Sequence, residues 1–117
     1  MVELRQYRTT ANRSPYADWF NRLDAVAGAK ISVAITRVEL GNTSDVKSVG
    51  DGVFELKVDF GPGYRVYFGW DGATLIILLG GGTKKRQSRD IQKARKHWRD
   101  YKSRRKQEQQ RLARLCH

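Results

Sequence analysis

The segment from residue 53 to residue 79 most constrains the fold, because its side chains alternate with the two-residue period of β-strands. Gly61-Pro62-Gly63 separates the first predicted strand from the second, and Asp71-Gly72 predicts a two-residue hairpin before the third. Residues 74–79 are almost entirely apolar, which is typical of a central strand covered on both faces. The apolar side chains that share one face of the first two strands are Phe54, Leu56, Val58, Phe60, Tyr64, Val66, Phe68 and Trp70. The segment therefore predicts an antiparallel sheet with an aromatic core on one face.

The opposite face of these strands carries cations and a tyrosine. If the connection at residues 61–63 contributes three residues, Asp59 faces Arg65 and Lys57 faces Tyr67 across the two strands. We expect these side chains to point outward, away from the aromatic core. The basic cluster that follows the third strand is Lys84, Lys85 and Arg86. A cationic face without histidine, cysteine or paired carboxylates favours phosphate as the ligand, and therefore RNA or DNA.

Helices are predicted before and after these strands in the chain. Ser14 and Pro15 begin the first helix, Gly28 interrupts it, and a second helix runs from about residue 29 to residue 40. Gly41-Asn42 ends the second helix, since both residues tolerate the left-handed conformation. Short strands are expected at residues 2–8 and 47–49, and Gly80-Gly81-Gly82 is expected to end the third strand of the central segment. From about Ser88 a long helix begins, with its apolar face formed by Ile91, Ala94, Trp98 and Tyr101.

The charge of the chain is concentrated near its C-terminus. Residues 1–83 contain nine Lys or Arg and nine Asp or Glu, whereas residues 84–117 contain fourteen Lys or Arg and three acids. The formal net charge of +11 therefore lies in the last 34 residues, which favours a polyanionic partner. The single cysteine, Cys116, excludes an intrachain disulfide framework, and no apolar window is long enough to span a membrane. We expect one domain over residues 1–117, with a core at about 2–101, a basic helical extension at about 102–117, and a cytoplasmic location.

Ribonuclease chemistry is possible with these residues and needs no metal or cofactor. A lysine crowded by other cations can lose its proton at moderate pH and act as a base or acid, whereas arginine stays charged and binds phosphate. His97 is expected on the surface of the last helix. The same spacing also allows a purely structural role without catalysis, in which Lys57 pairs with Glu55 or with a neighbouring strand and Arg65 pairs with Asp59.

Two stretches of the chain carry a family resemblance. They are GNTSDVKSVGDGVFELKVDFGPGYRVYF at residues 41–68 and LLGGGTKKRQSRDIQKA at residues 78–94. With the residues around them, roughly 14–101, they resemble the HigB-like addiction module killer proteins of the RelE/ParE toxin superfamily. The resemblance implies an α+β fold, in which a two-helix hairpin packs on a twisted, mainly antiparallel sheet of four or five strands and a basic C-terminal helix follows.

The resemblance also implies a toxin of a type II toxin–antitoxin system. Many members cleave mRNA on the ribosome with basic side chains, so the implied partners are mRNA, the ribosome and a small helix-turn-helix antitoxin, and the toxin itself is expected to be a monomer. The implied catalytic residues are Arg65, Lys57, Lys84 and Lys85, and the implied RNA-binding residues are Lys47, Tyr67, Arg86, Arg89, Lys93 and Lys96. Which lysine acts as the base stays open.

Two other functions fit the same fold class. ParE-type members of the superfamily inhibit DNA gyrase and cut no RNA, and a non-toxic nucleic-acid-binding remnant would use the sheet cations for binding alone. Cleaved mRNA during growth arrest distinguishes the ribonuclease from both alternatives.

Overall fold

A computed structural model, which describes residues 2–116, shows an α+β fold built on a five-stranded sheet. The strands are β1 (Glu3–Gln6), β2 (Val46–Gly50), β3 (Val53–Val58), β4 (Tyr64–Asp71) and β5 (Leu75–Thr83). Their order across the sheet is β1-β5-β4-β3-β2, with β1 parallel to β5 and every other pair antiparallel. The predicted α+β fold with a mainly antiparallel sheet is confirmed, and the apolar β5 lies inside the sheet between β1 and β4, as expected.

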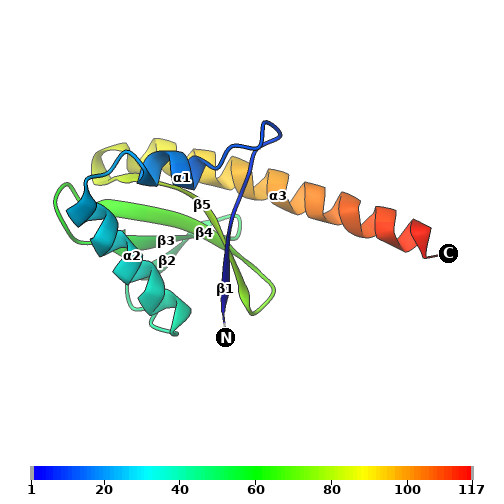
Figure 1. The fold of residues 1–117 in the computed structure, drawn as a ribbon, viewed down its shortest axis with the longest axis horizontal. Coiled ribbons are helices and arrows are strands. Elements are labelled where there is room, and N and C mark those ends of the chain that lie inside the picture. Colours follow the sequence, from blue (N-terminus) through cyan, green and yellow to red (C-terminus); the bar gives the residue numbers. More distant parts are fainter. Residues whose placement is uncertain (1, 117) are drawn as a thin grey trace.

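Two helices cover one face of the sheet, namely α1 (Pro15–Phe20) and α2 (Ala25–Glu39) (Figure 1). Ser14 caps α1 by accepting the Ala17 N–H at 3.0 Å, which confirms the predicted start. The break between the helices was predicted wrongly at Gly28, which lies within α2. Asp24 caps α2 instead, because its carboxylate accepts the Ala27 N–H at 2.9 Å.

The end of α2 follows the predicted glycine motif. Gly41 has a φ of +95°, which a residue with a Cβ rarely adopts. Its N–H donates to the Val38 carbonyl, and the next N–H, of Asn42, donates to the Arg37 carbonyl, both at 2.9 Å. This pair of hydrogen bonds is the Schellman arrangement, so α2 ends where the sequence indicates.

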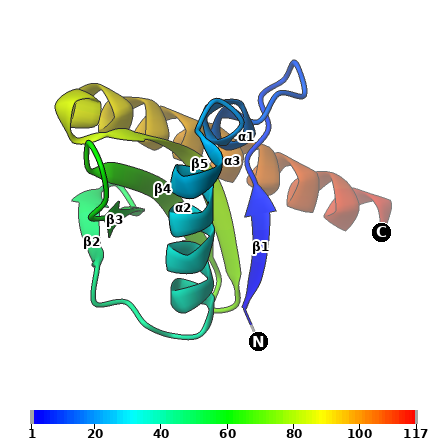
Figure 2. The same ribbon diagram turned by 60° about the vertical axis from the view of Figure 1, so that its left-hand side comes forward.

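The opposite face of the sheet is covered by α3 (Gln87–Leu115), which follows the short 3-10 turn η1 (Lys84–Arg86) (Figures 1 and 2). Ala94 and Trp98 are buried against the sheet, and Tyr101 stacks on Trp98 with ring centroids 5.3 Å apart. The second half of α3 extends away from the sheet (Figure 1), and its last turns are exposed. The predicted docking of the first half of this helix is thus confirmed.

The register of the central strands differs from the prediction. Val58 pairs with Tyr64, so the connection contains the five residues 59–63 and not three. Lys57 therefore faces Arg65, and Glu55 faces Tyr67. Because the shift is by two residues, all four side chains keep the same face of the sheet. The hairpin before β5 is also longer than predicted, with the three residues 72–74 between Asp71 and its partner Leu75.

Candidate nucleic-acid interface

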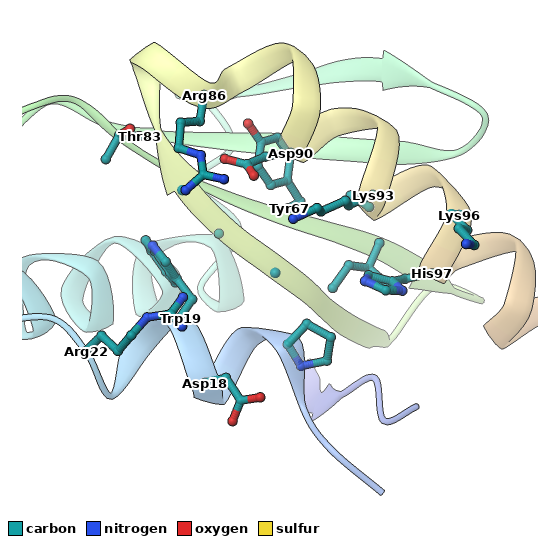
Figure 3. Close-up of a pocket in the computed structure, with 16 residues that line it drawn as sticks. Asp18, Trp19, Arg22, Tyr67, Thr83, Arg86, Asp90, Lys93, Lys96 and His97 are labelled. Carbon is teal, nitrogen blue, oxygen red and sulfur yellow. The ribbon is translucent and has the colours of Figure 1, made fainter. Parts of the chain in front are cut away.

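A cleft of about 840 Å³ lies between α1, the end of β5 and the first half of α3 (Figure 3). Its floor is the backbone of residues 79–83. One wall is formed by α1 and the residues around it, and the other wall by α3. β1 pairs only with residues 75–78 of β5, so the cleft begins where β5 no longer has a neighbouring strand on that side. The end of a strand, two helices and a free sheet edge thus meet at one place.

The three glycines of β5 shape the cleft by close packing. They do not end the strand as predicted, because Gly80, Gly81 and Gly82 continue the pairing with β4 past a bulge. A Cβ at Gly81 would lie 2.3 Å from the ring of Trp19, and a Cβ at Gly82 would lie 1.9 Å from the carboxylate of Asp90. Glycine is therefore required for α1 and α3 to approach the two faces of β5 this closely.

Four cations from three elements surround the cleft: Arg22 after α1, Arg86 at the end of η1, and Lys93 and Lys96 on α3 (Figure 3). Two carboxylates, Asp18 and Asp90, also line it. Burial raises the pKa of Asp90 above its ordinary value, against the lowering effect of Arg86, Lys93 and Arg89. The cations outnumber the acids, and the cleft therefore favours an anionic ligand.

A histidine that sequence reasoning assigned to the helix surface also lines this cleft. His97 is half-buried and stacks on the ring of Tyr7, with centroids 4.9 Å apart. The Tyr7 hydroxyl donates to Asp100 at 2.6 Å, which fixes the ring on which His97 stacks. Burial lowers the pKa of His97, and Lys96 and Lys93 lower it further, while Asp100 raises it. The imidazole is therefore neutral at pH 7 and can accept a proton.

The predicted cationic sheet face is not exposed, which corrects the expectation for Arg65 and Tyr67. The Arg65 side chain is 7% exposed, and its Nε lies 3.4 Å from Oε1 of Glu55, which is 1% exposed as a residue. Gln87 at the start of α3 donates to the other oxygen of Glu55 at 2.7 Å, and the Lys47 Nζ lies 3.7 Å from Oε1. α3 and η1 cover this face, so the polar side chains form a buried network around one carboxylate.

Arg65 pairs with an acid, as in the purely structural role that the sequence also allowed, but the partner is different. That alternative named Asp59, whereas the ion pair is with Glu55, which projects from the neighbouring strand on the same face. Tyr67 is buried beneath α3, and its hydroxyl has no hydrogen-bond partner within residues 2–116. Burial raises the pKa of Tyr67, with Glu55 and Asp90 adding to the effect. Stacking of an RNA base on the whole Tyr67 ring is therefore blocked, although the residue contributes to the inner wall of the cleft.

The remaining predicted site residues are distributed over three places. Arg86, Lys93 and Lys96 meet in the cleft. Lys84, Lys85 and Arg89 are exposed on η1 and the first turn of α3, close to it in sequence. Lys57 is exposed at the rim of a separate groove beside α2. The structure thus separates Lys57 from the cleft cations.

Sequence reasoning missed Glu55, Gln87, Arg22 and His97 as members of these arrangements. Glu55 has a detectable signal, since it alternates in phase with Lys57 on the face that carries the cations. His97 and Arg22 carry none, because their meeting depends on how α1 and α3 pack against β5. Among residues 2–116, no three His, Cys, Asp or Glu side chains gather as a metal site. No helix in the same described range is long and apolar enough to cross a membrane.

Comparison with known proteins gives two matches. Residues 18–101 match the family described as phage derived protein Gp49-like (DUF891). An uncharacterized protein of Haemophilus influenzae is 44% identical over 91 residues, which cover 77% of this chain and 89% of the relative. The family match spans the whole sheet except β1, and it includes every residue that lines the cleft apart from Pro15.

Proposed function

The chain belongs to the family of phage-derived Gp49-like proteins, which is related to RelE/ParE-type toxins, and from this premise we propose a ribosome-dependent mRNA endonuclease of the HigB-like kind. The family is associated with the toxins of toxin–antitoxin systems, so an antitoxin is the partner that this membership indicates. Within the proposal, the antitoxin is a small helix-turn-helix protein, the toxin is a monomer, and it acts on translated mRNA in the cytoplasm.

The cleft between α1 and α3 is the observation that carries the proposal. Its volume of about 840 Å³ falls within the usual range of ligand sites, about 300–1,000 Å³. Arg86 can bind a phosphate through two parallel hydrogen bonds, and Lys93 and Lys96 add charge along the same wall. The exposed Lys84, Lys85 and Arg89 extend this basic surface past the cleft, over η1 and the first turn of α3. A single RNA strand is a ligand that such a surface fits.

The proposed chemistry is attack by a ribose 2′-oxygen on the adjacent phosphorus. A base takes the proton of the 2′-hydroxyl, the O2′–P bond forms, and the P–O5′ bond breaks as the leaving 5′-oxygen takes a proton from an acid. His97, neutral at pH 7 and exposed to the cleft, is suited to accept that proton. Lys93, one helical turn before His97 on the same wall of the cleft, is suited to neutralise that phosphate and to protonate the leaving oxygen. Lys84, Lys85 and Arg86 lie about three turns or more toward the start of the helix, where they would bind phosphates farther along the strand.

Arg65 and Lys57 take different roles in this proposal. Arg65 is buried, and its Nη1 donates to the Tyr64 carbonyl at 3.2 Å, next to Gly63, whose carbonyl accepts the Lys84 N–H at 2.7 Å. We therefore assign Arg65 a structural role, through its buried ion pair with Glu55. Lys57 and Lys47 would act as electrostatic contacts at the edge of the sheet. The exposed second half of α3 would contact ribosomal RNA through its phosphates.

The test is induction in a bacterial host, with growth and mRNA 5′-ends recorded during the first minutes. The wild type should arrest growth with cuts inside translated codons, and Arg86→Ala/Lys93→Ala should lose both effects. Arg5→Ala/Lys30→Ala is the matched control, since it removes two exposed cations that lie outside the cleft. It should stay fully toxic.

Other outcomes of this experiment would overturn the proposal in defined ways. Arrest with intact mRNA and loss of DNA supercoiling would indicate a gyrase inhibitor. Absence of any arrest would leave a nucleic-acid-binding protein. Full toxicity of the folded Arg86→Ala/Lys93→Ala variant would remove the cleft from the mechanism, whatever the target.

A further inference from the structure

The outer side of α2 carries an exposed apolar stripe that the toxin fold does not use. Val26 is 59% exposed, Val33 is 51% exposed, and Leu40 at the C-terminal cap is 82% exposed. They are three of the five large apolar side chains exposed within residues 2–116. Each is separated from the next by seven residues, or about two helical turns, so all three lie along one line of the helix.

This stripe is opposite the side of α2 that packs on the sheet. Ala27, Ile31, Ile35 and Val38 are buried in the core. At 100° per residue, these four positions point away from the line of exposed side chains. Ala29 and Thr36 lie between the three exposed side chains, at the intervening positions of a heptad pattern. We call the surface formed by Val26, Ala29, Val33, Thr36 and Leu40 the seam. A helix at the surface of a globular protein normally has a polar outer side, so the apolar seam on α2 is unpartnered.

A groove of about 500 Å³ runs beside the seam, between α2 and the end of β3. Its apolar lining includes Val33 and Ala34 of α2 and Val58 and Phe60 of the sheet side. The seam and the groove therefore form one continuous apolar surface, since Val33 belongs to both. Figure 2 shows α2 in front of the sheet, with the connection to β2 passing below it.

Cations line one side of this surface. Lys30 and Arg37 are exposed on the flank of α2 that faces the groove, whereas Lys57 only borders it at the end of β3, with its side chain on the other face of the sheet. The Lys30 Nζ lies 5.5 Å from the centre of the Phe60 ring. Neither Lys30 nor Arg37 forms an ion pair within the described chain, residues 2–116. Asp45 and Asp59 lie on the strand side of the groove, so its cations are concentrated on the α2 side.

We propose that this seam and groove bind an amphipathic helix of the antitoxin, with apolar side chains toward Val26, Val33 and Leu40 and carboxylates toward Lys30 and Arg37. The identity of the partner as the antitoxin rests on the proposed function. To fit this surface, the partner helix needs apolar residues at seven-residue spacing and Asp or Glu along one flank. Removing about three large side chains from water gives the partner its affinity, and the cations select an acidic flank.

Two other occupants fit less well. A second copy with its α2 antiparallel to the first would bring Lys30 and Arg37 of both copies together, and like charges disfavour that arrangement. RNA would gain nothing from the valines and the leucine, because phosphate cannot use an apolar seam. The residues that line the groove and those that line the cleft do not overlap. An antitoxin helix bound at α2 therefore does not cover the walls of the cleft.

The experiment measures binding of the purified product of the gene adjacent to the one that encodes this chain, by isothermal titration calorimetry. Val33→Asp should weaken binding at least 30-fold, because it places a carboxylate in the middle of the seam. Leu112→Asp is the matched control: Leu112 is 49% exposed and lies on α3, so binding should change less than 3-fold. Lys30→Glu/Arg37→Glu should weaken binding about 10-fold, while Arg111→Glu/Arg114→Glu on α3 should not.

Unchanged binding by folded Val33→Asp would overturn the proposal, and so would equal effects of Val33→Asp and Leu112→Asp. Failure of the wild type to bind the neighbouring protein would overturn it as well. Sedimentation of the chain alone gives a further outcome, since a dimer that Val33→Asp dissociates would assign the seam to self-association. mRNA cleavage by the chain without its partner tests the proposed function separately, so the two failures are distinguishable.

Discussion

Replacing Arg65 with methionine should destabilise the fold, because it removes a charge from a buried network. Glu55 is 1% exposed and has three polar neighbours: Arg65 at 3.4 Å, Lys47 at 3.7 Å and Gln87 at 2.7 Å. Methionine fills a similar volume without the guanidinium. The carboxylate of Glu55 then stays buried with one hydrogen bond and one distant ammonium group, and this is the unfavourable state of a broken ion pair.

The size of the effect follows from what remains around the carboxylate. Breaking a buried pair by removing one partner costs about 3–5 kcal/mol. Because Gln87 and Lys47 remain, we expect the lower end, about 3 kcal/mol, which is a large part of the roughly 5–15 kcal/mol that stabilises a domain of this kind. With an m-value of about 2 kcal/mol/M, the urea midpoint should fall by about 1.5 M, measured by circular dichroism.

Two further variants make the reasoning refutable. Lys57→Met removes the cation directly across from Arg65 in the register, but Lys57 is exposed, so the free energy of unfolding should change by less than about 0.5 kcal/mol. Glu55→Gln/Arg65→Met removes both charges and should recover most of the loss, to within about 1 kcal/mol of the wild type. An Arg65→Met midpoint within experimental error of the wild type would show that the network does not stabilise the fold.

Three other outcomes are expected. His97→Gln should lower mRNA cleavage about 10²–10⁴-fold at pH 7, as measured in a translating extract. Because burial lowers the pKa of His97, the wild-type acid limb should lie below pH 6.5 and be absent from the variant. Gly81→Ala should cost about 1–3 kcal/mol in urea unfolding, since its Cβ would lie 2.3 Å from Trp19, and an unchanged midpoint would contradict that packing. Tyr7→Phe should cost about 1 kcal/mol at neutral pH through the lost hydrogen bond to Asp100. Since that bond lowers the pKa of Asp100, its contribution is present above the unfolded pKa of about 3.9 and lost as the pH falls through the lower folded value, so the cost should disappear in acid.

The elements of this fold were predictable where local chemistry determines them. Ser14 accepts a helix N–H, Gly41 adopts the left-handed conformation, and the alternation in residues 53–70 matches β3 and β4. Each of these depends on neighbours within a few residues in the chain. The break between α1 and α2 was misplaced because Gly28 was interpreted as a helix breaker, whereas the ring of Phe20 lies 3.4 Å from where its Cβ would be. Lack of a side chain at residue 28 serves packing between the helices.

The candidate site was predictable only in part, because it depends on contacts between distant elements. The alternation correctly placed Lys57, Arg65 and Tyr67 on one face of the sheet. It gave no information on whether that face is covered, and the number of loop residues that sets the register has no local signal. The cleft requires α1, β5 and α3 to meet, and the residues that allow this are glycines, whose partners the sequence does not identify.

The covering of the sheet face explains why the basic surface lies elsewhere. The Trp98 ring of α3 fits against β4 only because Gly69 has no side chain, since a Cβ there would lie 2.7 Å from the ring. Once Trp98 is seated, Arg65 and Tyr67 are beneath the helix and unavailable to a large polyanion. The same segment that covers them, residues 84–117, contains fourteen Lys or Arg. A polyanion that approaches this side therefore meets the cations of η1 and α3 first. In the cleft, some of these cations lie beside the backbone of residues 79–83, which forms the floor.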